Sequence, residues 1–126
     1  MPPEAFQYAV IRIVPRVERG ECLNAGIVLL CRGRRYLGAR VELDEGRLRA
    51  LAPAVDLDAV RRHLDALERV AHGEADAGSI GALGAAERFH WLVAPSSTVI
   101  QPSDVHTGLT DDPAAELDRL FRQLVL

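Results

Sequence analysis

Four polar residues stand where their side chains could do chemistry. Arg12 and Asn24 interrupt two otherwise apolar stretches, and His106 and Thr107 lie in a polar segment nearer the C-terminus. A histidine can donate or accept a proton near neutral pH, and a guanidinium can hold an anion. These residue types could build a site in which His106 acts as acid or base. No second catalytic group has an obvious place beside His106, so a loop histidine bonded to the backbone is the competing interpretation.

The sequence lacks the motifs of several familiar enzyme classes. The sequence contains no Gly-x-Ser-x-Gly, no glycine-rich phosphate loop after a strand, no His-Glu-x-x-His and no Asp-rich calcium loop. All 15 basic residues are Arg, which rules out a Schiff-base lysine and the lysine of a P-loop. Cys22 and Cys31 form no Cys-x-x-Cys pair, and no histidine spacing indicates zinc. The sequence therefore favours a non-enzymatic role and assigns no catalytic residue, no metal site and no cofactor.

Composition and net charge limit the cellular compartment and the classes of partner that we expect for this protein. The chain has 126 residues, 48% of them hydrophobic, which fits a single domain over residues 1–126. No stretch approaches the ~20 apolar residues of a membrane span, and the start lacks the features of a signal peptide. We therefore expect a cytoplasmic protein without membrane association. The formal net charge of −3 argues against a nucleic-acid partner.

Two apolar runs near the N-terminus predict the element that must position Arg12 and Asn24. Tyr8–Val14 and Cys22–Cys31 are rich in β-branched and other apolar residues, and the polar turn 16–21 separates them. This pattern is typical of an antiparallel β-hairpin. Both faces of the hairpin would be largely apolar, so we expect other elements to cover each face.

The pairing within the hairpin follows from the position of its turn. A turn centred on the Arg-Gly dipeptide of the loop would place Ile13 opposite Gly26 and Arg12 opposite Ile27. A buried Asn24 must find hydrogen-bond partners, either in the backbone of a β-bulge or in a ligand. Gly26 weakens a strand unless a packed helix, another backbone or a ligand comes close to it. The structural and the ligand-facing roles of Asn24 both stay open.

Downstream segments complete an α+β pattern. A third strand at Tyr36–Leu43, entered through the Arg-rich turn 32–35, would extend the hairpin into a meander. Apolar residues at helical spacing indicate helices over Leu57–Val70 and Leu117–Leu124, the second capped by Asp112. We predict an α+β fold with a three- to four-stranded, mainly antiparallel sheet built on the N-terminal hairpin and covered by two or three helices. The residues expected to be most buried are Ile27, Leu29, Leu64, Leu67 and Leu120.

The segment between these two helices admits two interpretations. The preferred one is a helix over residues 79–90, then a loop and a strand at Thr98–Gln101. The alternative pairs Phe89–Val93 with that strand as a second hairpin. Residues 101–108 are polar and rich in turn formers, so we expect an ordered surface loop that carries His106.

A longer set of residues resembles a known family. They are Tyr8, Arg12 and Pro15, then Arg19-Gly20-Glu21-x-x-Asn24-x-Gly26, and later Val105-His106-Thr107-Gly108 before the helix led by Asp112-Pro113. In these positions the chain resembles the bacterial family catalogued as domain of unknown function 3037, over nearly its whole length. The resemblance implies a small bacterial protein and no established activity, so no catalytic residue carries over. Some members are associated with neighbouring genes for a HipA-like kinase, which implies a protein partner, with a kinase as one candidate.

Two functions from different classes follow. In the first, the chain is a non-catalytic protein-interaction or regulatory module that docks through a sheet edge, the turn 32–35 or the His106 loop. In the second, it is a small enzyme or ligand-binding protein with a pocket near Arg12, Asn24 and His106. The lack of catalytic motifs favours the first, and homo-oligomerisation stays open. The candidate binding residues are Arg12, Arg19, Glu21, Asn24, His106 and Thr107.

Overall fold

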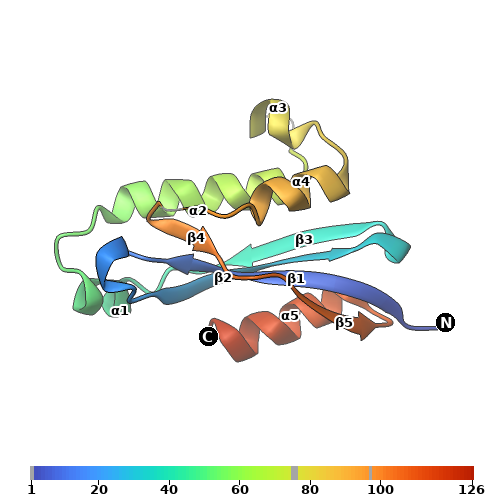
Figure 1. Ribbon diagram of the computed structural model, residues 1–126, viewed down its shortest axis with the longest axis horizontal. Helices are drawn as coiled ribbons and strands as arrows, with labels where there is room; N and C mark the ends of the chain where they lie inside the picture. The colour runs from blue at the N-terminus through green and yellow to red at the C-terminus, as the bar shows by residue number, and fades with distance from the viewer. Residues whose placement is uncertain (1, 75–76, 97) are drawn as a thin grey trace.

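The computed structural model describes residues 2–74, 77–96 and 98–126, and within them a five-stranded antiparallel sheet lies between two layers of helices (Figure 1). The strands are β1 (Glu4–Ile13), β2 (Leu23–Cys31), β3 (Tyr36–Val41), β4 (Ile100–Pro102) and β5 (His106–Thr110). The helices are α1 (Glu45–Leu51), α2 (Leu57–Ala71), α3 (Gly78–Gly81), α4 (Ala85–Leu92) and α5 (Pro113–Leu124), with the 3-10 turns η1 (Val17–Arg19) and η2 (Arg32–Arg34). The strand order is β3-β2-β1, and β4 and β5 share the other side of β1. The predicted α+β class and the hairpin-based antiparallel sheet are confirmed, with five strands in place of three or four.

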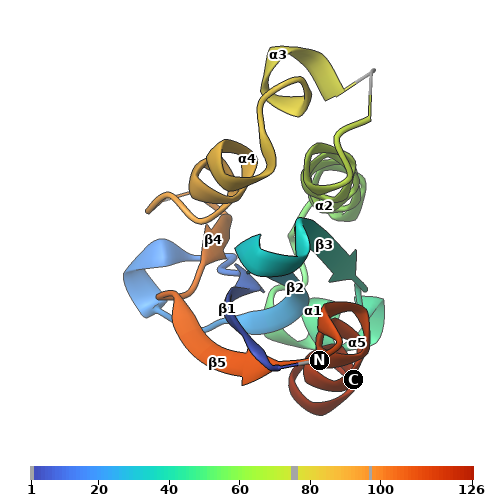
Figure 2. The same cartoon turned by 90° about the vertical axis from the view of Figure 1, so that its right-hand side faces the viewer.

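Each face of the sheet carries its own apolar core. Figure 2 shows α2 and α4 on one side of the sheet and α5 on the other. The core under α2 and α4 includes Ile11 and Val28, and the core over α5 includes Phe6 and Leu29. Both faces of the central strands are thus covered, which explains why their sequences are near-continuous apolar runs. The five residues expected to be most buried are all at most 8% exposed: Ile27, Leu29, Leu64, Leu67 and Leu120.

Helix starts follow the capping residues in the sequence. Asp112 accepts a hydrogen bond from the backbone N–H of Ala115, and Pro113 occupies the first helical position of α5. Asp56 caps α2 in the same way through Ala59. No helix in the described ranges combines the length and apolar character needed to cross a bilayer.

The register of the hairpin differs from the predicted one. Gly26 pairs with Ile11, two residues from the expected Ile13, and Arg12 pairs with Asn24. The register differs for two reasons. The 3-10 turn η1 makes the loop longer than a tight turn, and a β-bulge at the step from Ile11 to Arg12 leaves Ala25 of β2 without a partner on β1. Gly26 does make room for a neighbour, but that neighbour is β3 and no helix. An added Cβ there would lie 2.8 Å from the carbonyl oxygen of Arg40.

The segment after α2 departs from the expected single helix. The predicted helix over 79–90 is divided into α3 and α4, because Gly84 takes an extended backbone (φ −64°, ψ 161°) and starts α4 anew. The alternative hairpin is wrong, since Phe89–Val93 falls in α4 and at its C-terminal cap. Strand β4 forms one or two residues later than Thr98–Gln101. Phe89 is fully buried in the core.

His106 lies in a strand and not in the predicted loop. It opens β5, and the connection from β4 is only Ser103–Val105. Ser103 continues the pairing of β1 across this connection: its N–H donates to the carbonyl oxygen of Val10 and its hydroxyl accepts from the N–H of Val10, both at 2.8 Å. An outer strand needs few apolar residues, so its polar sequence looked like a loop.

Candidate functional site

The six candidate binding residues fall in three separate places on the sheet. Arg12 and Asn24 are cross-strand neighbours on β1 and β2. A second pair, in the hairpin loop, comprises Arg19 and Glu21. His106 and Thr107 open β5, where His106 lies opposite Tyr8. Tyr8 and Arg12 are four residues apart along β1, about 13 Å at ~3.3 Å per residue.

Asn24 connects β2 to the end of α5. Its amide Nδ2 donates to the carbonyl oxygen of Leu124 at 3.0 Å, which satisfies one of the carbonyls that a helix C-terminus leaves free. Asn24 also lines a cavity of about 240 Å³ with Glu42, Asp44 and Arg47. Neither Arg12 nor His106 is among the residues that line this cavity. The hydrogen bond gives Asn24 a structural role that accounts for its place in an apolar strand.

Arg12 lies half-buried on the sheet face that carries α5. Its cross-strand neighbours are Asn24 on β2 and Gln101 on β4, so three polar residues form a row across the sheet beside the end of α5. Gln101 donates to the carbonyl oxygen of Thr98 at 2.8 Å. The row could hold a polar group of a ligand or partner, although no catalytic base or acid faces Arg12 within it.

The hairpin loop carries two exposed ion pairs. Arg19 pairs with Glu21, and Arg16 with Glu18 at 3.0 Å. The hydrogen bond from Arg19 lowers the pKa of the Glu21 carboxyl, and Glu21 raises the pKa of Arg19. Arg19, Glu21 and Arg16 line one wall of a cavity of about 580 Å³, whose other wall is the apolar segment 50–55. Exposed pairs of this kind contribute little to stability.

Strand β5 forms an outer edge of the sheet. It pairs with β1 on one side only, and Figure 2 shows its ribbon beside β1 at the margin of the sheet. Its sequence, His-Thr-Gly-Leu-Thr, contains no carboxylate and no Arg. The side chain of Leu109 is 70% exposed, and Val105, just before the strand, is 38% exposed. An uncharged outer strand with exposed apolar residues is a template for pairing with another chain.

The opposite margin of the sheet is protected. The N–H of Val41 in β3 donates to the carboxylate of Glu68 on α2 at 3.2 Å. Arg40 pairs with Asp118 of α5 and lies 4.3 Å from the ring centre of Phe121. Charged side chains of both helices, Glu68 and Asp118, therefore lie beside the C-terminal end of β3, and charges at an outer strand hinder pairing with another chain.

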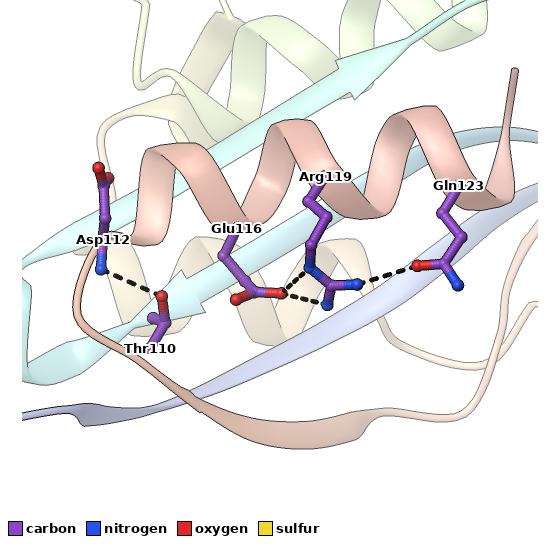
Figure 3. Close-up of polar contacts among 5 residues, drawn as sticks. All are labelled: Thr110, Asp112, Glu116, Arg119 and Gln123. Atoms are coloured by element: carbon purple, nitrogen blue, oxygen red, sulfur yellow. Dashed lines mark hydrogen bonds and ion pairs between the residues drawn. The ribbon is translucent and has the colours of Figure 1, made fainter.

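Both ends of β5 are fixed. Ser103 holds the beginning to Val10, as described above. At the other end Arg34 of η2 donates to the carbonyl oxygens of Asp111 at 2.8 Å and of Pro2 at 3.0 Å. The hydroxyl of Thr110 accepts from the N–H of Asp112 at 3.1 Å (Figure 3). The open edge is thus held in a defined position.

Both aromatic and polar side chains lie next to β5. The ring of His106 lies 5.2 Å from the ring of Tyr8, and Tyr8 lies 6.0 Å from Phe6. Thr107 lines a cavity of about 360 Å³ together with Glu4 and Arg32, so the Arg-rich turn and the start of β5 share one surface. On α5, Figure 3 shows polar side chains that bond one another, Glu116, Arg119 and Gln123.

Sequence reasoning missed the residues that define this edge. Leu109 directly follows residues 101–108, which were predicted to be a loop, and the sequence analysis assigned it to no element; an apolar residue beside polar turn formers was a usable signal. The sequence analysis singled out Arg34 only as part of the Arg-rich turn 32–35, and Ser103 not at all. Their hydrogen bonds could not be predicted, because the partners are backbone atoms distant in sequence. In residues 2–74, 77–96 and 98–126, no three His, Cys, Asp or Glu side chains converge as a metal site would require.

The fold and this edge define a small α+β protein in which a hairpin-based sheet is covered on both faces and has β5 as an outer strand. The chain belongs to the family described as Protein of unknown function (DUF3037), which matches residues 8–125. The resemblance drawn from the sequence is therefore confirmed. No curated protein and no solved structure matches the chain significantly. The family description assigns no activity, so a function has to be argued from the geometry of the open edge.

Proposed function

We propose that this protein is a non-catalytic protein-interaction module that binds an extended segment of a partner protein along β5. The observation that carries the proposal is the open, uncharged outer side of β5 with Leu109 exposed by 70%. In strand addition, the backbone N–H and C=O groups that point away from the sheet supply affinity, and alternate side chains supply specificity.

The anchored ends of β5 support this function energetically. A binding strand that is already ordered does not have to lose backbone freedom on association. Ser103 and Arg34 hold the two ends of β5 to β1 and to η2. His106 and Thr107, which open the strand, are assigned to the recognition surface, whereas Asn24 is assigned to the scaffold that holds α5.

The competing function, a ligand pocket near Arg12, Asn24 and His106, has less support. It would need His106 to approach the cavity that Asn24 lines, and the register of β1 with β5 separates the two along the sheet. The protein-partner function needs no such approach. The HipA-like kinase implied by the family resemblance is the first partner to test.

Site-specific photo-crosslinking in the native host tests the proposal. Leu109 is replaced by a photo-reactive benzoylphenylalanine, and Leu126, which is similarly exposed at 65%, receives the same replacement as a matched control. We expect a discrete adduct with a partner protein from position 109 and none from position 126. Mass spectrometry then maps the attachment and shows whether the partner is the kinase. Adducts from position 126 alone would place the interaction surface elsewhere.

A further inference from the structure

The geometry points to a definite chemistry for the segment that pairs with β5. We infer that it is an extended strand with apolar residues in its middle and basic side chains at both ends, and that it belongs to a different protein and not to a second copy of this chain. The inference rests on the proposed function, since it names the partner chemistry of the same edge. Its two supports are the carboxylates that frame β5 and the exposed leucine within it.

Three carboxylates lie next to the two ends of β5, which itself contains no carboxylate and no Arg. Asp104 lies just before β5, and Asp111 and Asp112 lie just after it, all exposed. None of the three forms an ion pair with another described residue. Arg34, the cation that reaches this end, donates to the backbone oxygen of Asp111, and Asp112 uses a carboxylate oxygen to cap α5. A partner strand therefore meets exposed carboxylates, none of them in an ion pair with another described residue, near both of its ends, and basic side chains complement them.

The middle of the edge favours an apolar neighbour. Leu109 lies opposite Ala5 on the sheet face that carries α2 and α4, beyond the reach of either helix core, and is 70% exposed. A strand added outside β5 would place a side chain directly beside Leu109, at the ~5 Å spacing of cross-strand pairs. An apolar side chain there removes surface of both partners from water. The segment that fits is thus apolar at its centre.

Self-pairing is disfavoured by the same charges. In an antiparallel pair of β5 strands centred on Gly108, Asp104 just before the strand of one copy would approach Asp112 just after the strand of the other copy, and symmetry would repeat this approach at the other end. A parallel pair would place each aspartate opposite itself. Like charges directly opposite in a sheet are destabilising, so a second copy is a poor occupant.

Synthetic peptides test the inference with the full chain. The probe is a fluorescent peptide of alternating Val and Thr with two Arg at each end, and its counterpart carries Glu at each end. Fluorescence anisotropy should show binding of the Arg-flanked peptide that weakens as salt rises, and at least about tenfold weaker binding of the Glu-flanked peptide. The double variant Asp104→Asn/Asp111→Asn should remove most of this preference.

A matched variant separates local from general charge effects. Asp65→Asn/Glu87→Gln removes the same charge from exposed positions on α2 and α4, so it should keep the preference for the Arg-flanked peptide. Leu109→Lys should abolish binding of both peptides while leaving the melting temperature unchanged.

Each of the following outcomes would overturn the inference, and some of them would leave the proposed function intact. Equal binding of both peptides that Leu109→Lys abolishes would refute the charge complementarity but keep strand addition. No peptide binding alongside a host adduct from position 109 would show that the partner is not a basic-ended strand. Concentration-dependent dimers in sedimentation, lost in Leu109→Lys, would identify a second copy as the occupant.

Discussion

Replacement of Ser103 by Ala should loosen the place where β4 passes into β5. The Ser103 side chain is 6% exposed, and its hydroxyl accepts from the N–H of Val10 at 2.8 Å and donates to the carbonyl oxygen of Asp104 at 2.9 Å. Ala removes little volume, so almost the whole effect comes from a buried N–H left without its partner. That loss should lower the free energy of unfolding by ~1–3 kcal/mol, or about 3–5 °C in Tm for each kcal/mol at this chain length.

Two measurements check this expectation. Urea unfolding gives the change in stability, and native-state hydrogen exchange should show faster exchange at the amide of Val10 than at amides of the β1–β2 ladder. Ser79→Ala, at an exposed position of α3, is the matched control and should change neither quantity. Wild-type stability together with a wild-type exchange rate at Val10 would refute the anchoring of β5 by Ser103.

Further predictions concern the cores, the α5 contact and the hairpin loop. Leu120→Ala should lower the free energy of unfolding by ~2–5 kcal/mol in urea titration, because it leaves a cavity between α5 and the sheet; an equally stable variant would contradict the face assignment. Asn24→Leu should lower the melting temperature clearly, since the last carbonyl of α5 loses its donor; unchanged stability with lost binding would instead support a ligand-facing Asn24. By NMR titration the pKa of the Glu21 carboxyl should lie below its ordinary value of 4.5, and this pKa should rise in Arg19→Ala. Because the pKa is lowered in the folded state, the pair contributes to stability above pH 4.5, and this contribution is lost as the pH falls. The double variant Arg19→Ala/His106→Ala should keep its circular dichroism spectrum and melting temperature while partner capture weakens; unfolding would make these residues scaffold.

The parts of the fold that local patterns determine were predictable from the sequence. The cap Asp112 and the apolar stripes of α2 and α5 each depend on residues within one or two turns, and they lie where expected. The same holds for the two apolar faces of the hairpin. Register was not predictable, because neither the longer loop with η1 nor the bulge at Ile11 and Arg12 is marked by a local sequence pattern.

The sequence offered six candidate binding residues, but it predicted only in part which of them lie close together. Arg19 and Glu21 do meet, since they are two residues apart in one turn, and Arg12 and Asn24 meet because both belong to the hairpin. His106 could not be placed from the sequence, because its position is set by pairing with Tyr8 about a hundred residues earlier. Polar residues on an outer strand carry the same composition as a loop, so only the tertiary pairing separates the two.

The two margins of the sheet differ in protection, and this difference is the main support for the proposed function. If the chain had no partner, physical chemistry would favour the same protection on both outer strands, since each presents unpaired backbone groups. On β3 that protection is present, with Glu68 on the backbone and Arg40 held over Phe121. Strand β5 contains no carboxylate and no Arg, and its exposed Thr107 and Leu109 do not repel an incoming strand. A single Lys at position 109 would supply the missing protection without strain, because that side chain is already in solvent, so the exposed leucine supports the proposed binding of a partner strand.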